Sequence, residues 1–203
     1  MKIHEFTMAP NPRRVRIFLA EKGITVPYEQ VDLMTAKNRA PEFLAKNPMG
    51  GVPVLELDDG SFIAESVAIC RYFETLHPEP RLMGGPDAKD AATVEMWQRR
   101  MEFQILGTVA GCFRNTSPFF KGRITQVAEW GEVCRRDALK RLEWLDSELA
   151  NRQFVAGDRF TIADITALVG IDFGRMVDIK IAHGLKNLQR WYDAVSSRPS
   201  AKA

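Results

Sequence analysis

The hydrophobic pattern of this chain changes once, and the change divides the chain into two parts. In the first 80 residues, short stretches with the alternating pattern of half-buried strands are separated by stretches with helical spacing. Beyond them no convincing strand pattern remains, and apolar residues recur three and four positions apart. We therefore expect an α/β domain over residues 1–80, a linker over 81–87 and an all-helical domain over 88–203.

The first domain is expected to follow the order β-α-β-α-β-β-α. Residues 2–6 alternate polar and apolar side chains, and residues 26–33 have the pattern of a second strand. Between them, Asn11 is a good N-cap, Pro12 suits the first helical turn and Gly23 suits the position just after the helix.

Residues 54–57 and 61–64 give the clearest local signal, a β-hairpin with an Asp-Asp-Gly turn. A short helix opened by proline is expected at 41–45, and Ser66 is expected to cap the helix that follows the hairpin. Strands joined through a helix run parallel and hairpin strands run antiparallel, so the sheet is expected to be mixed.

The remaining chain predicts helices only. We expect a helix over residues 88–115 and an amphipathic helix over 128–152. Thr161 and Asp164 have the spacing of a capping box, which would open a further helix. The last helix is expected over 185–197.

Composition and charge exclude several classes of protein. The 28 Lys and Arg residues nearly balance the 26 Asp and Glu residues, so the net charge of +2 demands no nucleic-acid partner. No apolar run reaches the ~18 residues of a membrane-spanning helix, so no membrane partner is expected. The three cysteines and three histidines show no metal-ligand spacing, so no metal is expected. We interpret the cysteines as free thiols in a reducing cytoplasm.

Two motifs beside the hairpin each allow a structural and a functional interpretation. Pro53 either simply begins a strand or forms a cis peptide bond that turns the backbone of Val52 toward an extended ligand. Ser66 is either a cap only, or it binds a carboxylate together with the first N–H groups of its helix while Glu65 pairs with an ammonium group. A carboxylate beside an ammonium group is typical of the end of an α-amino acid. One hairpin separates the motifs, so we expect them on the same edge of the sheet.

A family resemblance supports the functional interpretation. Residues 47–57 read Asn-Pro-Met-Gly-Gly-Val-Pro-Val-Leu-Glu-Leu, and residues 64–69 read Ala-Glu-Ser-Val-Ala-Ile. Together with residues 9–17 and 160–165, they are similar to the motifs of cytosolic glutathione S-transferases, in the same order along nearly the whole chain. The resemblance implies a thioredoxin-like α/β domain followed by an all-α domain, with glutathione as co-substrate and a homodimeric assembly.

The resemblance also implies roles for individual residues. Glu65 and Ser66 should hold the γ-glutamyl end of glutathione. Val52, presented by cis-Pro53, should pair with the backbone of the cysteinyl residue.

The glycyl carboxylate of glutathione has fewer expected partners. Lys37 and Asn38 lie where relatives contact the glycyl carboxylate, although Lys37 is alternatively a solvated loop charge. Many relatives place a lysine directly before the Val-Pro, where this chain has Gly51. Loss of that cation would weaken binding by about 1–3 kcal/mol, unless Lys37 compensates.

The usual catalytic residue is absent. Relatives place Tyr, Ser or Cys just after the first strand, whereas this chain has Ala9 at the aligned serine position and Thr7 as the nearest hydroxyl. The details resemble a yeast-type, theta-like bacterial subgroup, in which a serine and a histidine hold a water that assists thiol ionisation. The aligned residues here are Ala110 and Arg114, so that mechanism does not transfer. We expect the helix start at Asn11 and the charge of Arg114 to stabilise the thiolate, with a plain surface role as the alternative for Arg114.

Two sets of side chains near Arg114 are candidates for contacts with a second substrate. The polar set is Asn115, Thr116 and Ser117. The aromatic set, which alternatively belongs to the core, is Phe113, Phe119 and Phe120. Relatives build their dimer interface on the first long helix, which here carries Arg99, Arg100 and Glu102.

The leading hypothesis is therefore a glutathione S-transferase that attacks a small hydrophobic electrophile in the cytoplasm, as in detoxification. The same thiolate would also reduce an organic peroxide. A non-catalytic glutathione-fold binding or interaction module is the alternative, and the absent hydroxyl favours it. Thiol-disulfide exchange is disfavoured, because no cysteine lies near Ala9.

Overall fold

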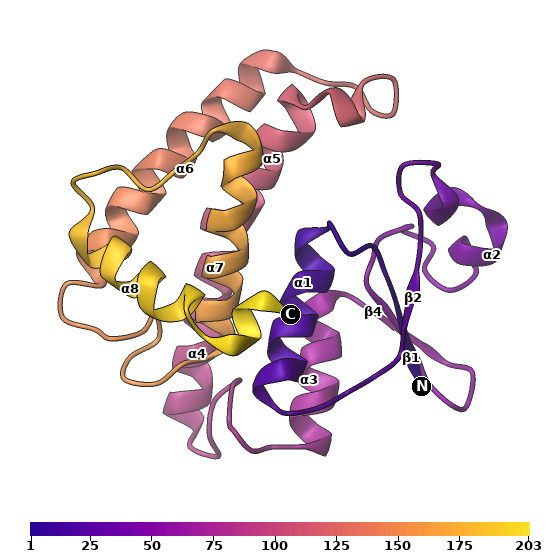
Figure 1. Cartoon of the computed structure of the whole chain (residues 1–203), viewed down its shortest axis with the longest axis horizontal. Coiled ribbons are helices and arrows are strands. Elements are labelled where there is room, and N and C mark those ends of the chain that lie inside the picture. Colours follow the sequence, from indigo (N-terminus) through magenta and orange to yellow (C-terminus); the bar gives the residue numbers. More distant parts are fainter. The chain divides into compact units, whose positions relative to one another are not determined.

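The computed structural model describes all 203 residues, which form two compact units (Figure 1). The first unit contains Met1–Leu82 together with Pro199–Ala203, and the second contains Met83–Arg198. The last residues therefore belong to the unit with the sheet, whereas the sequence pattern assigned them to the helical domain. Arg13 holds them there through a hydrogen bond of 3.1 Å from its Nη2 to the carbonyl oxygen of Ala201.

The first unit is built on a four-stranded sheet with the order β2-β1-β3-β4. The strands are β1 (Lys2–Glu5), β2 (Tyr28–Gln30), β3 (Val54–Glu56) and β4 (Phe62–Ala64). β1 runs parallel to β2, and β3 runs antiparallel to both β1 and β4. The predicted mixed sheet is confirmed, although the second strand is shorter than the expected 26–33.

Helices cover both faces of this sheet (Figure 1). They are α1 (Pro10–Glu21), α2 (Pro41–Leu44) and α3 (Ser66–Leu76). Phe43 of α2 packs edge-on against His4 of β1, with ring centroids 6.4 Å apart. Since successive strand residues point to opposite faces, Ile3 and its partner Leu55 point toward α1 and α3, and both are fully buried.

The starts of two helices differ from the sequence prediction. α1 begins at Pro10, so Asn11 lies inside the first turn and is not the cap. Proline at the first helical position is pre-organised for the helix and has no N–H to leave unsatisfied, which explains the earlier start. α3 begins at Ser66 with Glu65 at the N-cap, so Ser66 does not cap it either. The predicted end of α1 is confirmed, because Gly23 follows the helix with a φ of +65°.

The second unit contains helices and no strands. They are α4 (Ala88–Arg100), α5 (Gly107–Thr116), α6 (Ala128–Glu148), α7 (Ile162–Gly174) and α8 (Lys186–Ser196). A π-helical segment, Met101–Leu106, joins α4 to α5, so the helix expected over 88–115 is continuous but locally widened. α7 is the central helix, since nearly all of its residues are buried by the others. None of the helices combines the length and the apolar character that crossing a bilayer requires.

The predicted capping box of α7 is confirmed, and it reaches into the core. The N–H and hydroxyl of Thr161 donate to Asp164 Oδ2 at 2.9 and 3.2 Å. The other oxygen, Oδ1, accepts from the Val155 N–H and from Trp191 Nε1, each at 2.8 Å. Burial raises the pKa of the Asp164 carboxyl to about 6, so these four donors offset the desolvation of an anion at neutral pH.

Asp164→Ala is expected to lower the free energy of unfolding by about 2–5 kcal/mol, because it leaves several buried donors without an acceptor. Urea denaturation followed by tryptophan fluorescence measures the loss. Asp158→Ala is the matched control, since Asp158 is exposed and forms no hydrogen bond or ion pair, and it should change stability by less than about 0.5 kcal/mol. Similar losses in both variants would contradict a structural role for the Asp164 network.

Candidate functional site

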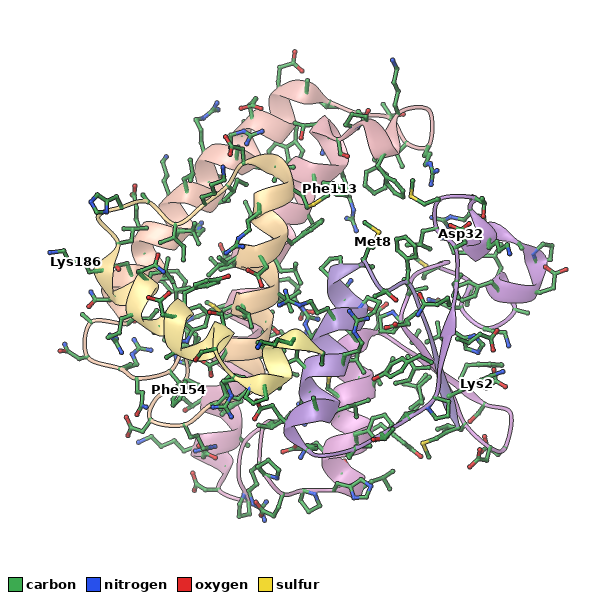
Figure 2. All side chains as sticks on the ribbon, viewed as in Figure 1. Lys2, Met8, Asp32, Phe113, Phe154 and Lys186 are labelled. Carbon is green, nitrogen blue, oxygen red and sulfur yellow. The ribbon has the colours of Figure 1, made fainter.

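The candidate site lies at the end of the sheet where β1 ends and β3 begins. β1 and β3 are antiparallel with His4 opposite Val54, so the carboxyl end of β1 meets the amino end of β3. Val54 also pairs with Ala64, the last residue of β4. Figure 2 shows Met8, which follows β1, and Asp32, which follows β2, at this same end of the unit. The segments after β1, before β3 and after β4 therefore share one edge, as the sequence predicts.

Thr7, the hydroxyl nearest to the usual catalytic position, is engaged in the loop after β1. Its N–H donates to Gln30 Oε1 at 3.1 Å, and its hydroxyl lies 3.0 Å from the same oxygen and 3.3 Å from Glu5 Oε1. Its carbonyl oxygen accepts from Arg16 Nη2 at 3.0 Å, and Arg16 also pairs with the buried Glu5 carboxylate at 2.5 Å. Since both neighbours of the hydroxyl are acceptors, its proton is already committed. Thr7 stabilises the loop and has no hydrogen to donate to a thiolate.

The first turn of α1 carries a single free N–H. Pro10 and Pro12 have no amide hydrogen, and the Arg13 N–H returns to the carbonyl oxygen of Ala9 at 3.4 Å. The N–H of Asn11 has no hydrogen-bond partner, and its side chain is exposed. Because a helix start carries partial positive charge, the Asn11 N–H is the group of this turn that can bind an anion.

Val52 presents a free stretch of backbone. The Val52–Pro53 peptide bond is cis, in agreement with the functional interpretation of Pro53. Strand pairing begins only at Val54, and neither the N–H nor the carbonyl oxygen of Val52 has a hydrogen-bond partner. The Val52 side chain packs against the cluster of Val31, Phe43 and Val54, which anchors this backbone. One free donor and one free acceptor on an anchored residue can pair with an extended peptide.

Glu65 and Ser66 form the start of α3. Glu65 has a φ of +68°, a backbone conformation rare for a residue with a Cβ, and its side chain is exposed. Ser66 is only 5% exposed, and its Oγ accepts a hydrogen bond of 2.8 Å from Arg14 Nη1. The N–H groups of Ser66, Val67 and Ala68 have no partners. Free N–H groups at a helix start, next to a hydroxyl, suit the binding of a carboxylate.

A short 3₁₀ turn after β2 is fastened to the segment before Val52. Asn38 Nδ2 donates to the Gly50 carbonyl oxygen at 2.7 Å, so this amide holds the loop. Lys37 is exposed and forms no ion pair. Arg39, which the sequence analysis did not consider, also lies here, with its Nη1 donating to the Met49 carbonyl oxygen at 3.2 Å. Only the fold brings this long side chain to a segment ten residues away, so no local pattern reveals it.

The two neighbouring glycines of this segment have different reasons to be glycine. Gly50 has a φ of +65°, and a Cβ there would lie 2.8 Å from Arg39 Nη1 and 2.9 Å from the Asn38 carbonyl oxygen. At Gly51 a Cβ would lie 3.6 Å from Asn47 Nδ2, which is an ordinary contact. The lysine that many relatives carry at the second position is therefore not excluded by space.

No cysteine is placed as a nucleophile. All three are buried. Burial raises the pKa of the Cys70 thiol to about 12 and also raises that of Cys134, so both remain neutral thiols. No cluster of three or more His, Cys, Asp or Glu side chains is arranged to hold a metal ion.

Arg114 belongs to the second unit, in the last turn of α5. Its side chain is exposed and forms no ion pair, while its carbonyl oxygen accepts from Gln126 Nε2 at 2.8 Å. The polar set beside it is engaged in hydrogen bonds within the α5–α6 turn through Asn115, Thr116 and Ser117. Of the polar side chains that the sequence singled out in this region, Arg114 is thus the one left free to contact a ligand.

The aromatic set of the second unit forms a half-buried cluster. Phe113 packs against Phe173 and Phe120 with ring centroids 4.8 and 5.6 Å apart, and Phe119 lies 4.9 Å from Phe120. The cluster is partly core and partly accessible, so it combines both interpretations of these residues. Its accessible part is an apolar surface.

The groups of the first unit suit one kind of ligand. The start of α3 can bind a carboxylate, Glu65 can pair with an ammonium group, and Val52 can pair with the peptide bonds between. Lys37 and Arg39 can pair with a second carboxylate. A short extended peptide with a free α-amino acid end has these groups in this order.

Comparisons with known proteins agree with this arrangement. Residues 3–81 match the family model of the glutathione S-transferase N-terminal domain, and residues 110–199 match that of the C-terminal domain. Glutathione S-transferase 2 of Saccharomyces cerevisiae is 37% identical over 206 residues, which cover 100% of this chain and 88% of that protein. The crystal structure of Gtt2 from Saccharomyces cerevisiae matches with a TM-score of 0.94 at 36% identity, covering 100% of this chain and 99% of the other. A class Gtt2 glutathione S-transferase of Vibrio parahaemolyticus matches with a TM-score of 0.88 at 36% identity, covering 100% and 96%.

A thioredoxin-like unit with this edge, followed by a helical unit, defines a glutathione S-transferase, and the chain belongs to that family. Within the family it is a member of the yeast-type subgroup, to which the Saccharomyces protein belongs. The resemblance read from the sequence motifs is confirmed for both the fold and the subgroup.

Gly50→Ala is expected to destabilise the first unit more than Gly60→Ala. Both positions have a positive φ, which costs a residue with a Cβ about 1–2 kcal/mol. Only the Cβ at position 50 would also press on Arg39 and Asn38, which adds about 1–3 kcal/mol of overpacking, whereas position 60 is open. Urea denaturation of the two variants measures the difference in stability. Equal midpoints would contradict the prediction and show that Arg39 and Asn38 move aside at no cost in free energy.

Proposed function

We propose that this chain is a glutathione transferase, which binds glutathione along the first unit, lowers the pKa of its thiol and directs the thiolate at a small hydrophobic electrophile. The observation that carries the proposal is the unpaired backbone of Val52, one hairpin away from the exposed Glu65 and the start of α3. An extended tripeptide with an α-amino acid end is complementary to these groups.

Each part of glutathione has a proposed partner. The γ-glutamyl ammonium group pairs with Glu65, and its carboxylate binds the hydroxyl of Ser66 and the free N–H groups that follow. The cysteinyl residue pairs with the backbone of Val52, which Pro53 follows in cis. These contacts would hold the cysteinyl sulfur near the loop after β1.

The glycyl carboxylate is proposed to bind the cations of the 3₁₀ turn. Lys37 is exposed and without an ion pair, and Arg39 adds a second charge beside the Val52 segment. Asn38 already donates to the Gly50 carbonyl oxygen, so its proposed contribution is to hold these cations in place. Arg39 then partly replaces the lysine that this chain lacks at Gly51.

Thiol activation is proposed to depend on Asn11 and Arg114. A thiol with a pKa of about 8.5–9 must lose about two pKa units to ionise near neutral pH, which is roughly 2.7 kcal/mol. The Asn11 N–H at the start of α1 contributes about 0.3–1 kcal/mol, up to about 2 when partly buried. The charge of Arg114 supplies the remainder. Thr7 does not take part, because its hydroxyl donates to Gln30 or Glu5.

The electrophile is proposed to contact the accessible part of the Phe113, Phe119 and Phe120 cluster. This surface is apolar and aromatic, and it suits a flat or hydrophobic substrate. The thiolate sulfur forms the new carbon–sulfur bond, and the electrophile releases its leaving group or takes up a proton.

A homodimer in the cytoplasm is part of the proposal. Apolar side chains stand exposed on the helix that carries Arg99, Arg100 and Glu102, since Met96 is 41% and Phe103 is 60% exposed. Arg99 lies over the Phe103 ring at 5.9 Å, so this face offers both apolar and charged contacts to a second copy. The three unpaired thiols favour a reducing compartment.

The proposal is tested by measuring glutathione binding by calorimetry and turnover with an aromatic halide and with cumene hydroperoxide. Glu65→Gln is expected to weaken glutathione binding by at least tenfold, because it removes the partner of a charged group. Glu42→Gln is the control, since Glu42 is an exposed glutamate of the same unit without ionic contacts. Binding without any turnover would favour a binding module, and absence of binding would contradict the proposal.

Arg114→Ala is expected to raise the pKa of enzyme-bound glutathione by about one unit, since it removes a charge that favours the thiolate. The pH dependence of kcat/KM with an aromatic halide measures this pKa. Thr7→Val and Arg141→Ala should leave it unchanged, the latter because Arg141 is an exposed arginine of α6 without ionic contacts. An unaltered pH profile in Arg114→Ala would remove Arg114 from the mechanism.

Gly51→Lys is expected to tighten glutathione binding by about tenfold, because it restores a cation for the glycyl carboxylate at a position with room for a side chain. Calorimetry at low ionic strength measures the gain, and Gly51→Gln separates charge from bulk. No gain with lysine would show that Lys37 and Arg39 already neutralise that carboxylate.

A further inference from the structure

Arg14 is a buried arginine that reaches from the first helix of the sheet unit to the start of α3. Its side chain is only 1% exposed. It lies on the buried side of α1, together with the core residues Val15 and Phe18. Its Nη1 donates a hydrogen bond of 2.8 Å to the Oγ of Ser66. A charged side chain is rarely buried so completely, so its effect on Ser66 is of interest.

This hydrogen bond fixes the direction of the Ser66 hydroxyl. A guanidinium group has donors only, so Ser66 must act as the acceptor. The hydroxyl proton of Ser66 therefore points away from Arg14, and the structure offers it no acceptor. Ser66 is 5% exposed, and a buried hydroxyl proton normally has an acceptor. The proton is therefore available for a hydrogen bond to a ligand at the start of α3.

The positive charge next to this proton is that of Arg14 itself. Cys70 lies near Arg14, Lys22 and Glu74, and its thiol stays neutral because burial raises its pKa to about 12. Glu74 forms an ion pair of 2.6 Å with Lys22. Lys22 and Glu74 compensate each other's charge, so the positive charge that contacts Ser66 and favours an anion at the start of α3 is that of Arg14.

We propose that Arg14 is a positioning residue that orients the Ser66 hydroxyl as a donor toward the ligand and thereby favours a carboxylate over a carboxamide at its γ-glutamyl end. A carboxylate offers acceptors only and matches a site lined by donors. A carboxamide brings an NH₂ group that needs an acceptor, and Arg14 already uses one of the two lone pairs of the Ser66 oxygen, so the hydroxyl meets the ligand mainly as a donor. This inference rests on the proposed function, since it concerns the head group of glutathione.

The test compares two ligands by calorimetry. One is glutathione, and the other is glutathione with the α-carboxylate of its γ-glutamyl residue replaced by a carboxamide. Arg14→Met is expected to weaken binding of glutathione by about tenfold, because a carboxylate loses an aligned donor and a nearby charge. Binding of the carboxamide should change much less, since the released Ser66 oxygen can then accept from its NH₂ group.

Arg13→Gln is the matched control. It removes a cation from the next position of the same helix, but Arg13 donates to Ala201 and not to Ser66. It should leave unchanged the ratio of the dissociation constant of the carboxamide to that of glutathione. A ratio that falls equally in both variants would overturn the proposal, because it would reflect the charge of α1 alone.

Two further variants keep the test valid if Arg14→Met does not fold. Arg14→Gln keeps a polar side chain, although a shorter and uncharged one, and its amide oxygen can accept the Ser66 proton, so it too should reduce the ratio. In a Ser66→Ala background, either Arg14 substitution should have little further effect on the ratio. Full additivity of the Ser66 and Arg14 effects would overturn the proposal, as would an equal loss for both ligands, which a merely structural role produces.

Failure of this inference is distinguishable from failure of the proposed function. If the wild-type chain binds glutathione but does not discriminate between the ligands, Arg14 has no positioning role while the transferase proposal stands. If the wild-type chain binds neither ligand, the proposed function itself fails, and the inference fails with it.

Discussion

The register of the β3–β4 hairpin determines the geometry of the candidate site. Val54 opposes Ala64, so the free backbone of Val52 and the start of α3 are held apart by a hydrogen-bonded ladder and not by flexible loops. Because side chains alternate along a strand, a slip by one residue would reverse the faces of β4 and displace Glu65. The spacing of these candidate binding groups is thus a direct result of strand pairing, and the Asp-Asp-Gly turn of the hairpin contributes to it.

Patterns local in sequence predicted much of this structure. The hairpin and the Thr161–Asp164 capping box were evident because each depends on residues within a few positions of one another. The start of α1 was predicted two residues too late and that of α3 one residue too late, since a good capping residue such as Asn11 does not show where the backbone enters the helical region. Neither Arg14 nor Arg39 was singled out, because each long side chain acts on a segment that only the fold brings near.

Without a catalytic hydroxyl, the proposed activation of the thiol depends on a backbone N–H together with the charge of Arg114. Pro10 and Pro12 have no amide hydrogen, so the N–H of Asn11 is the one free donor at the positive end of α1. A backbone donor has no titratable proton, and it remains whatever the side chain of residue 11 is. The proposed interaction with the thiolate therefore needs no tyrosine or serine after β1.

The return of residues 199–203 to the sheet unit has a consequence for how the protein is made. Arg13 and Glu21 of α1 hydrogen-bond to Ala201 and Ser200, so one side of an N-terminal helix is completed by residues that lie beyond the whole helical unit in the chain. A ribosome releases the segments in order, and the nascent α/β unit must wait for the rest of the polypeptide before this side is covered. Proteolysis between the units would likewise separate the α/β unit from a piece of itself.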